Sequence, residues 1–313
     1  MSKELRVIHA EMLIELAEHH DNVVVLEADL MSSVSTRKFA DAYPKQFIQC
    51  GIAEANMIGV AAGLSAVGKV PFVHSFGCFA TRRCYDQIFL AGGYAEQHLN
   101  IFGSDAGVTA VTNGGTHMPF EDTGLMRLVP NATVIDISDE HVLRAAMRYA
   151  YNHRGVNYIR STRKDLPHIY QPETEIKIGK GNILKDGEHL TLIASGISVH
   201  DAMQAAVIIE EKNNYSVAVI DMHTIKPIDT ELAVKYAKKT GHIITIENHN
   251  VIGGLGDAVA SELLTSGVTI KYFHKLGVQE QYGQVGTLDF LKETYGISVE
   301  KIVECSEKAL LKS

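Results

Sequence analysis

The chain has 313 residues, with 29 lysines and arginines against 37 aspartates and glutamates, which gives a formal net charge of −8. This length predicts two domains with full hydrophobic cores, and 46% hydrophobic with 21% charged residues argues against disorder. The negative charge argues against a nucleic-acid partner, which would require surplus lysine and arginine. No segment approaches the roughly 18 apolar residues of a membrane span, and the N-terminus is unlike a signal peptide. Four cysteines without a CxxC pair predict a reduced, cytoplasmic protein.

The first half of the chain alternates between helical and strand patterns. Apolar residues recur at helical spacing over the first twenty residues, and the run NVVVLEAD at 22–29 predicts a parallel strand that is covered on both faces. Further helices are expected at Glu54 to Val67, about Thr81 to Glu96, Glu121 to Leu128 and Glu140 to Tyr151. Further strands are expected at 70–74, 99–103, 132–136 and 156–160, with a Gly/Thr-rich loop at 107–117. Strands separated by helices imply crossover units and a mostly parallel sheet.

The pattern fails between 165 and 180, where Pro167 and Pro172 lie among polar residues, and we place a linker at 167–180. The alternation then resumes. The second half predicts strands at 190–195, 216–221, 242–247 and 268–273, and helices at Val199 to Lys212, Thr230 to Lys239, about 254–266 and twice near the C-terminus. We therefore expect an α/β protein of two doubly wound domains, at 1–166 and 181–313, the second smaller than the first.

Several common motifs are weak or missing. GGLGDAV at 253–259 follows a strand and precedes a helix, but Val259 occupies the third glycine position of a dinucleotide fingerprint, so a tight turn is the better interpretation. GxxxxGK[ST] and HExxH do not occur, and Ser198 lacks the GxSxG context of a hydrolase nucleophile. Nucleotide-hydrolase, zinc-protease and serine-hydrolase chemistry therefore have no support.

Glu54 is the strongest candidate for chemistry. It lies where a loop becomes a helix, in QCGIAEANMIGVAAGLSA, and that helix has almost no polar face. A helix that is apolar all round is expected to be buried, so its first-turn carboxylate is expected to be buried too. The pattern alone is equally compatible with an acid that is favoured by the helix dipole.

GIAEAN followed by MIGVAAGLSAVGKVPFVHSF resembles the pyrimidine-binding domain of transketolases, enzymes of the thiamine-diphosphate superfamily. NVVVLEADL, GGTHMPFED and IENHNVIGGLGDAVASELL resemble further segments of that family, so the likeness covers nearly the whole chain. It is closest to split transketolases, in which two polypeptides make one enzyme. The Gly-Asp-Gly to Asn motif that binds metal and diphosphate is missing. The resemblance therefore implies a C-terminal subunit, with a transketolase C-terminal-like second domain, whose partner binds the diphosphate and the magnesium or calcium ion.

The resemblance also implies roles for individual residues. Glu54, Phe76 and Phe79 match the family's residues at the pyrimidine of thiamine diphosphate, and Asp29 and Ile52 match positions close to the cofactor. Glu54 is the expected catalytic acid, because a desolvated carboxyl can hold and donate a proton at neutral pH. His117 matches a histidine that contacts the substrate hydroxyls beside the reactive carbon. The expected reaction moves a two-carbon ketol unit from a ketose to an aldose.

The positions that match substrate contacts at the distal end of the sugar differ from the family in part. Arg6, Ser33 and Arg163 match the residues that bind a terminal phosphate. Asp105 replaces a second substrate histidine, Thr112 and Asn113 replace an acidic pair, and Arg82 stands where a third aromatic is usual. A carboxylate repels a phosphate dianion. We therefore expect Arg82 or Arg163 to neutralise Asp105 in a pocket retuned for a sulfonate or an uncharged sugar end.

Three alternatives remain open. Deoxyxylulose-phosphate synthases carry a similar YDQ, present here at 85–87, but are single chains, and beta subunits of 2-oxo-acid dehydrogenases share the two-domain division. Asn56 and the THMP loop favour transketolase over both. The third alternative is a non-catalytic paralogue that stabilises a complex. The cofactor of this family lies between two chains, so we expect a heterotetramer with the partner subunit, or self-association across a two-fold axis.

Overall fold

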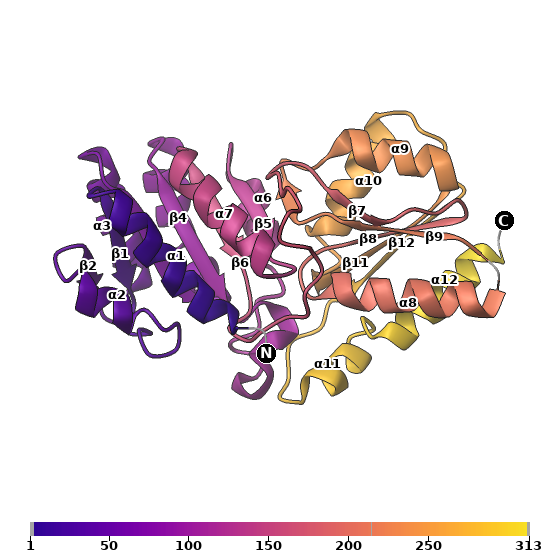
Figure 1. Cartoon of the computed structure of the whole chain (residues 1–313), viewed down its shortest axis with the longest axis horizontal. Helices are drawn as coiled ribbons and strands as arrows, with labels where there is room; N and C mark the ends of the chain where they lie inside the picture. Colours follow the sequence, from indigo (N-terminus) through magenta and orange to yellow (C-terminus); the bar gives the residue numbers. More distant parts are fainter. Residues whose placement is uncertain (1–2, 214, 312–313) are drawn as a thin grey trace.

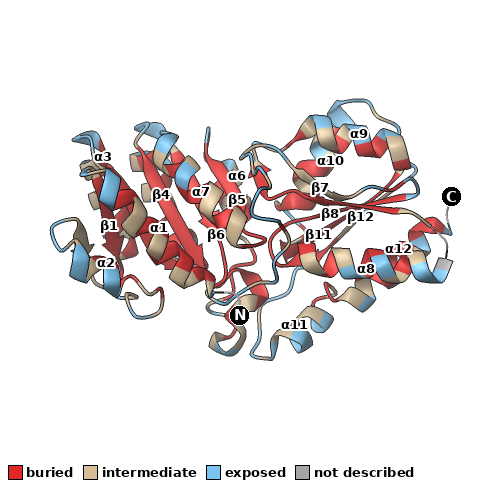
Figure 2. Ribbon diagram, viewed as in Figure 1, coloured by how far each residue is buried: buried red, intermediate tan, exposed pale blue. Residues whose placement is uncertain are grey.

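The computed structural model describes residues 3–213 and 215–311, and it arranges them as two α/β units side by side (Figure 1). Each unit has a mainly parallel sheet with helices on both faces, which confirms the predicted fold class. Figure 2 shows that the strands at the centre of each unit are buried. Within the described residues no helix is long and apolar enough to cross a membrane.

The first unit is built on a seven-stranded sheet of order β10-β5-β6-β4-β3-β1-β2. Its helices are α1 (Leu5–His19), α2 (Arg37–Ala42), α3 (Glu54–Ala66), α4 (Gly77–Ala80), α5 (Tyr85–Gln87), α6 (Asp122–Leu128) and α7 (Glu140–Asn152). Its strands are β1 (Val23–Glu27), β2 (Phe47–Gln49), β3 (Val70–Phe76), β4 (Leu99–Ser104), β5 (Thr133–Asp136), β6 (Val156–Arg160) and β10 (Thr224–Lys226). Apolar side chains of α1 and α7 cover one face and those of α3 cover the other, so the continuous apolar strands predicted from the sequence are buried on both sides.

The second unit has a five-stranded sheet of order β12-β11-β8-β9-β7, in which β7 is antiparallel to β9. Its strands are β7 (Asn182–Lys185), β8 (Leu190–Ala194), β9 (Val217–Asp221), β11 (His242–Asn250) and β12 (Tyr272–Val278). Its helices are α8 (Ser198–Asn213), α9 (Thr230–Thr240), α10 (Leu255–Thr265), α11 (Leu288–Thr294) and α12 (Val299–Leu310). Helices α8 and α12 cover one face, and α9 and α10 cover the other (Figure 1).

Three expectations about the elements are wrong. The last sheet strand begins at Tyr272 instead of 268, because its pairing starts where Tyr272 lies opposite His242, the first residue of β11. The single helix expected at 81–96 is a series of short turns, a 3-10 helix at Arg82–Cys84, α5, and a π-helix at Ile88–Tyr94. The loop expected at 107–117 contains a 3-10 helix at Gly107–Asn113.

The two units are joined by strand β10 and by a cluster of buried charged side chains. Strand β10 follows β9 in the chain but pairs antiparallel with β5 of the first sheet. Arg160 at the end of β6 is 1% exposed, and its Nε and Nη1 donate to Asp122 at 2.7 Å and Asp136 at 3.3 Å. Arg160 Nη2 donates to the carbonyl of Asn248 in β11 at 2.7 Å, and the hydroxyl of Ser195 in the second unit donates to Asp136 at 2.8 Å. The interface is therefore polar at its centre, where Asp122 Oδ1 is buried without a hydrogen-bond partner among the described residues. The domain boundaries expected at residues 166 and 181 stay a prediction.

Candidate functional site

Glu54 is the first residue of α3, and it is 2% exposed, which confirms the predicted burial. The strand β3 beside it supplies the Ser75 hydroxyl, 3.4 Å from Oε1. A buried carboxylate needs a partner, and here Nη1 of Arg83 donates to both carboxylate oxygens, at 2.8 and 2.9 Å. The site therefore holds a buried acid that is paired with a cation of the same chain.

The rest of α3 is not buried on all sides, contrary to the expectation. Asn56, Gly59, Gly63 and Ala66 are exposed along one face, and a Cβ built on either glycine meets no atom within 4 Å. The sequence pattern could not reveal this face, because glycine and alanine count as apolar in either environment.

Three rings gather beside Glu54, and we call Phe76, Phe79 and His117 the aromatic cluster. Phe76 ends β3 and Phe79 lies in α4, with ring centroids 6.1 Å apart. The His117 ring meets the Phe76 and Phe79 rings edge-on, at 5.6 and 5.1 Å. The predicted pyrimidine contacts and the predicted substrate histidine are thus brought together at the carboxyl end of β3, where open α/β sheets bind ligands.

A second group, which we call the arginine cluster, comprises Arg6, Ser33, Asp105 and Arg163. Arg163 Nε donates to Asp105 Oδ1 at 2.9 Å, and its guanidinium lies 5.2 Å from the Phe76 ring centroid. Arg6 Nη1 donates to the Ser33 carbonyl at 3.2 Å, and its backbone N–H donates to the Arg163 carbonyl at 3.2 Å. The predicted substrate residues are therefore neighbours, and Arg163 connects them to the aromatic cluster.

Asp105 is paired as expected, by one of the two arginines proposed for it. Arg163 is its partner, whereas Arg82 donates to Glu121 at 2.6 Å, so the expectation that Arg82 neutralises Asp105 is not met. Burial raises the pKa of the Asp105 carboxyl, although Arg163 opposes the shift. Asp105 also has φ +59°, a left-handed conformation that non-glycine residues rarely adopt and that concentrates at functional sites.

Three predicted site residues lie at the open edge of the site. Asp29 follows β1 with φ +63°, and its backbone N–H donates to the Gln49 side chain at 2.8 Å. Ile52 is 75% exposed just before α3. Asn113 is half-buried at the end of the 3-10 helix Gly107–Asn113. The side chains of Asp29 and Ile52 are exposed in the single chain.

Arg83 is the residue that the sequence analysis missed. Besides its bonds to Glu54, its guanidinium carbon lies 3.7 Å from the centroid of the Phe79 ring. The available signal was its spacing of four residues from Phe79, which puts two side chains on one helical face. That signal was obscured because the segment breaks into short 3-10 and α turns.

Buried polar side chains, among them His74 and Glu27, lie close to the arginine cluster. His74 of β3 stands opposite Glu27 of β1 in the sheet, and Nδ1 of His74 is 3.6 Å from the Glu27 carboxylate. The Thr36 hydroxyl donates to the same carboxylate at 2.7 Å. His9 of α1 stacks on Phe102 at 3.9 Å, and burial lowers the pKa of His9 well below its usual value, which favours the uncharged imidazole.

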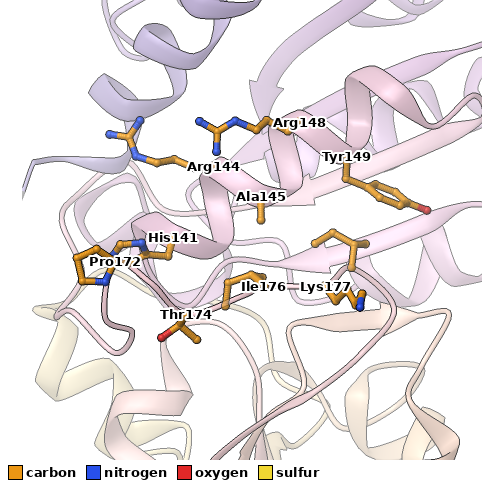
Figure 3. Close-up of a pocket in the computed structure, with 10 residues that line it drawn as sticks. His141, Arg144, Ala145, Arg148, Tyr149, Pro172, Thr174, Ile176 and Lys177 are labelled. Atoms are coloured by element: carbon orange, nitrogen blue, oxygen red, sulfur yellow. The ribbon is translucent and has the colours of Figure 1, made fainter.

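The cavity between α7 and the segment 172–178 has a volume of about 660 Å³ (Figure 3). Arg144 and Arg148 line it, but Arg148 is paired with Glu15 at 3.0 Å and Arg144 lies 3.8 Å from Glu11. None of the predicted site residues lines this cavity, so we do not assign it to the candidate site. One group of potential metal ligands was found among the described residues, at the start of α7 and in the linker: Glu140, His141 and His168.

Comparisons with known proteins agree with this arrangement. The model of the transketolase pyrimidine-binding domain matches residues 2–168, and that of the transketolase C-terminal domain matches residues 179–302. The chain is 42% identical to the 6-deoxy-6-sulfo-D-fructose transketolase subunit of Clostridium sp., over 97% of this chain and 94% of the relative. It is 39% identical to a putative transketolase C-terminal section of Methanocaldococcus jannaschii, over 96% and 95%.

A solved structure described as a split gene transketolase in an inactive β4 tetramer is similar over 99% of both chains, with a TM-score of 0.89 and 37% identity. The two matched domain models together cover residues 2–168 and 179–302, and this chain covers 94% of the Clostridium relative. The chain belongs to the transketolase family, and the similar proteins of matching length include one described as a transketolase subunit and one described as a split gene transketolase.

Proposed function

We propose that this chain is the pyrimidine-binding subunit of a thiamine-diphosphate-dependent transketolase that moves a two-carbon ketol unit from a ketose to an aldose. The observation that carries the proposal is the buried carboxylate of Glu54 beside the aromatic cluster. Such a site combines a proton-exchanging acid, flat apolar faces and a hydrogen-bonding imidazole. A transketolase requires all three.

The residues present fit an aminopyrimidine. The guanidinium of Arg83 is a flat group with in-plane donors, and it already stacks on Phe79 while donating to Glu54. The guanidinium thus occupies a space between Phe79 and Glu54, which we call the pyrimidine slot, and this space offers a flat aromatic face and carboxylate acceptors to a flat, nitrogen-bearing ring. We infer that Phe76, Phe79 and Glu54 would hold the pyrimidine, with Asp29 and Ile52 at its edge.

Thiamine diphosphate, when bound, supplies a nucleophilic carbon and an electron sink for the two-carbon fragment. The chain's own residues would do the rest. Glu54 would hold and return a proton at its carboxylate oxygen, shielded from water by Phe76 and Phe79. His117 would hydrogen-bond the sugar hydroxyls through its imidazole, which the edge-on contacts with both rings keep oriented toward the site.

The remaining parts of the site would come from other chains. We propose that a separate subunit binds the diphosphate together with magnesium or calcium. The surface around α3 supports such an assembly, because it is open and apolar: Ile52 and Val67 are each 75% exposed, and Tyr94 is 84% exposed. The β4 state of the similar solved protein supports self-association of this chain when the partner is absent.

The arginine cluster suggests the nature of the sugar. Arg163 is already paired with Asp105, and an added phosphate dianion would meet a nearby carboxylate. A sulfonate carries one negative charge and is repelled less. Because the relative with 42% identity is a 6-deoxy-6-sulfo-D-fructose transketolase subunit, we propose a ketose with a distal sulfonate as the donor.

Reconstitution tests the proposal. The chain, the diphosphate-binding subunit, thiamine diphosphate and Mg²⁺ are mixed, and transfer to an aldose phosphate is followed with 6-deoxy-6-sulfofructose and with fructose 6-phosphate as donors. We expect a higher kcat/KM for the sulfonate. Glu54→Gln keeps the size of the side chain but removes its proton exchange, so kcat should fall roughly 10²–10⁴-fold.

Glu304→Gln on the exposed face of α12 is the matched control and should leave kcat unchanged. An assembled complex that transfers nothing from any ketose, or a Glu54→Gln variant with full activity, would favour the non-catalytic scaffold. Preference for the phosphate donor would overturn only the sulfonate assignment.

A further inference from the structure

The position of Arg83 has a consequence for how the site is filled. Its Nη1 lies 2.8 and 2.9 Å from the two oxygens of Glu54, and its guanidinium covers the Phe79 ring at 3.7 Å. A guanidinium is planar and delocalised, and it both stacks on aromatic faces and donates hydrogen bonds in its plane. Arg83 therefore satisfies the buried acid and the exposed aromatic face at the same time.

An aminopyrimidine would use the same two partners in the same way. It would stack on Phe79 and hydrogen-bond with the Glu54 carboxylate, and two flat groups cannot occupy that volume together. We propose that Arg83 is a placeholder that fills the pyrimidine slot of the cofactor-free chain and withdraws when the cofactor binds. This inference rests on the proposed function.

The surroundings of Arg83 permit such a movement. Its side chain is 43% exposed, whereas that of Glu54 is 3% exposed, so the arginine has solvent to move into and the acid does not. Arg83 lies in a 3-10 turn between α4 and α5, and a π-helix follows α5, so the segment is not one regular helix. Its neighbour Arg82 is paired with Glu121 and does not compete for Glu54.

The placeholder also has a structural benefit. Without a cation, the Glu54 carboxylate would be buried with the Ser75 hydroxyl, at 3.4 Å, as its one remaining side-chain donor among the described residues. A buried charge that loses its partner is strongly destabilising. Arg83 therefore stabilises the unassembled chain, and the cofactor must displace it, which weakens the apparent affinity for the cofactor.

Calorimetric titration of thiamine diphosphate with Mg²⁺ into the cofactor-free complex of this chain and its diphosphate-binding partner tests the inference. Arg83→Met removes the charge and the planar donors but keeps an unbranched side chain. We expect its dissociation constant to be about five- to tenfold lower than that of the wild type, since one exposed cation–π contact and one half-exposed ion pair are lost. Arg83→Lys, which keeps the charge only, should lie between the two.

Arg148→Met is the matched control, because Arg148 and its partner Glu15 are both about half exposed, and it should leave the dissociation constant within about twofold. In the isolated full chain, thermal unfolding followed by circular dichroism should show a lower melting temperature for Arg83→Met than for Arg148→Met, since Arg83 pairs with a buried acid and Arg148 with a half-exposed one. A folded Arg83→Met complex that binds the cofactor as weakly as the wild type, or more weakly, overturns the placeholder inference but leaves the proposed function standing. A wild-type complex that binds no thiamine diphosphate overturns the proposed function itself.

Discussion

Removing the guanidinium of Arg160 should destabilise the chain more than removing that of any exposed arginine. Arg160 is 1% exposed and donates to Asp122, to Asp136 and to two backbone carbonyls, one of them in the second unit. Arg160→Met would leave two carboxylates buried without a cation. Breaking a buried ion pair in this way costs about 3–5 kcal/mol of unfolding free energy. The hydroxyls of Tyr158 and Ser195 still donate to the carboxylates, so we expect the lower end of that range.

The expected loss of unfolding free energy grows as the pH rises. Burial already raises the pKa of Asp136, and without Arg160 this carboxyl would take up a proton in the folded variant that the unfolded chain releases above about pH 4. The folded variant then binds more protons than its unfolded chain, so its stability falls as the pH rises. The deficit relative to the wild type should be larger at pH 8 than at pH 5.

Urea unfolding at equal protein concentration, followed by circular dichroism at both pH values, measures the effect. Arg148→Met is the matched control, because Arg148 and its partner Glu15 are each about half exposed and such pairs contribute at most about 1 kcal/mol. A loss below about 1 kcal/mol for Arg160→Met, or a deficit that grows at low pH, would refute the reasoning.

Two further predictions concern stability. Gly107→Ala should lower the unfolding free energy measured in urea by more than about 2 kcal/mol, because Gly107 has φ +49° and a Cβ there would lie 2.2 Å from the Asn248 side-chain oxygen. Gly63→Ala, at a position with open space around it, should be neutral or mildly stabilising. Burial raises the pKa of Asp221 to about 7, so the stability that its neutral form contributes is complete below about pH 4 and is lost as the pH rises through 7. Asp221→Asn should therefore flatten the decline between pH 4 and 8, by at most about 4 kcal/mol; an unchanged slope in a pH series of unfolding curves would contradict this.

Much of the fold could be predicted because its signal is local. Buried parallel strands such as β1 and β3 have continuous apolar runs, and α1 and α7 have apolar residues at helical spacing. The strands β2, β7 and β10 were missed. They have three or four residues each, and their existence depends on pairing with distant strands that leave no mark on their own composition.

The candidate site, like the fold, could be predicted only in part. The burial of Glu54 was predicted correctly, although the helix from which it was inferred exposes one face, and the resemblance to transketolases identified residues that the structure brings together. Arg83 was missed because its partners are set by a broken helical segment, whose turns of different pitch no periodic pattern describes. The sequence also could not determine that Asp105 pairs with Arg163 and not with Arg82, because this depends on which loop approaches which strand end.

The short strand β10 limits how the chain can be divided. If the gene were cut at the linker, the first fragment would lack its outermost strand, and the backbone groups of β5 would be left bare. Bare edges of this kind recruit other chains and promote aggregation. We therefore expect the two halves to fold and to be produced only as one piece.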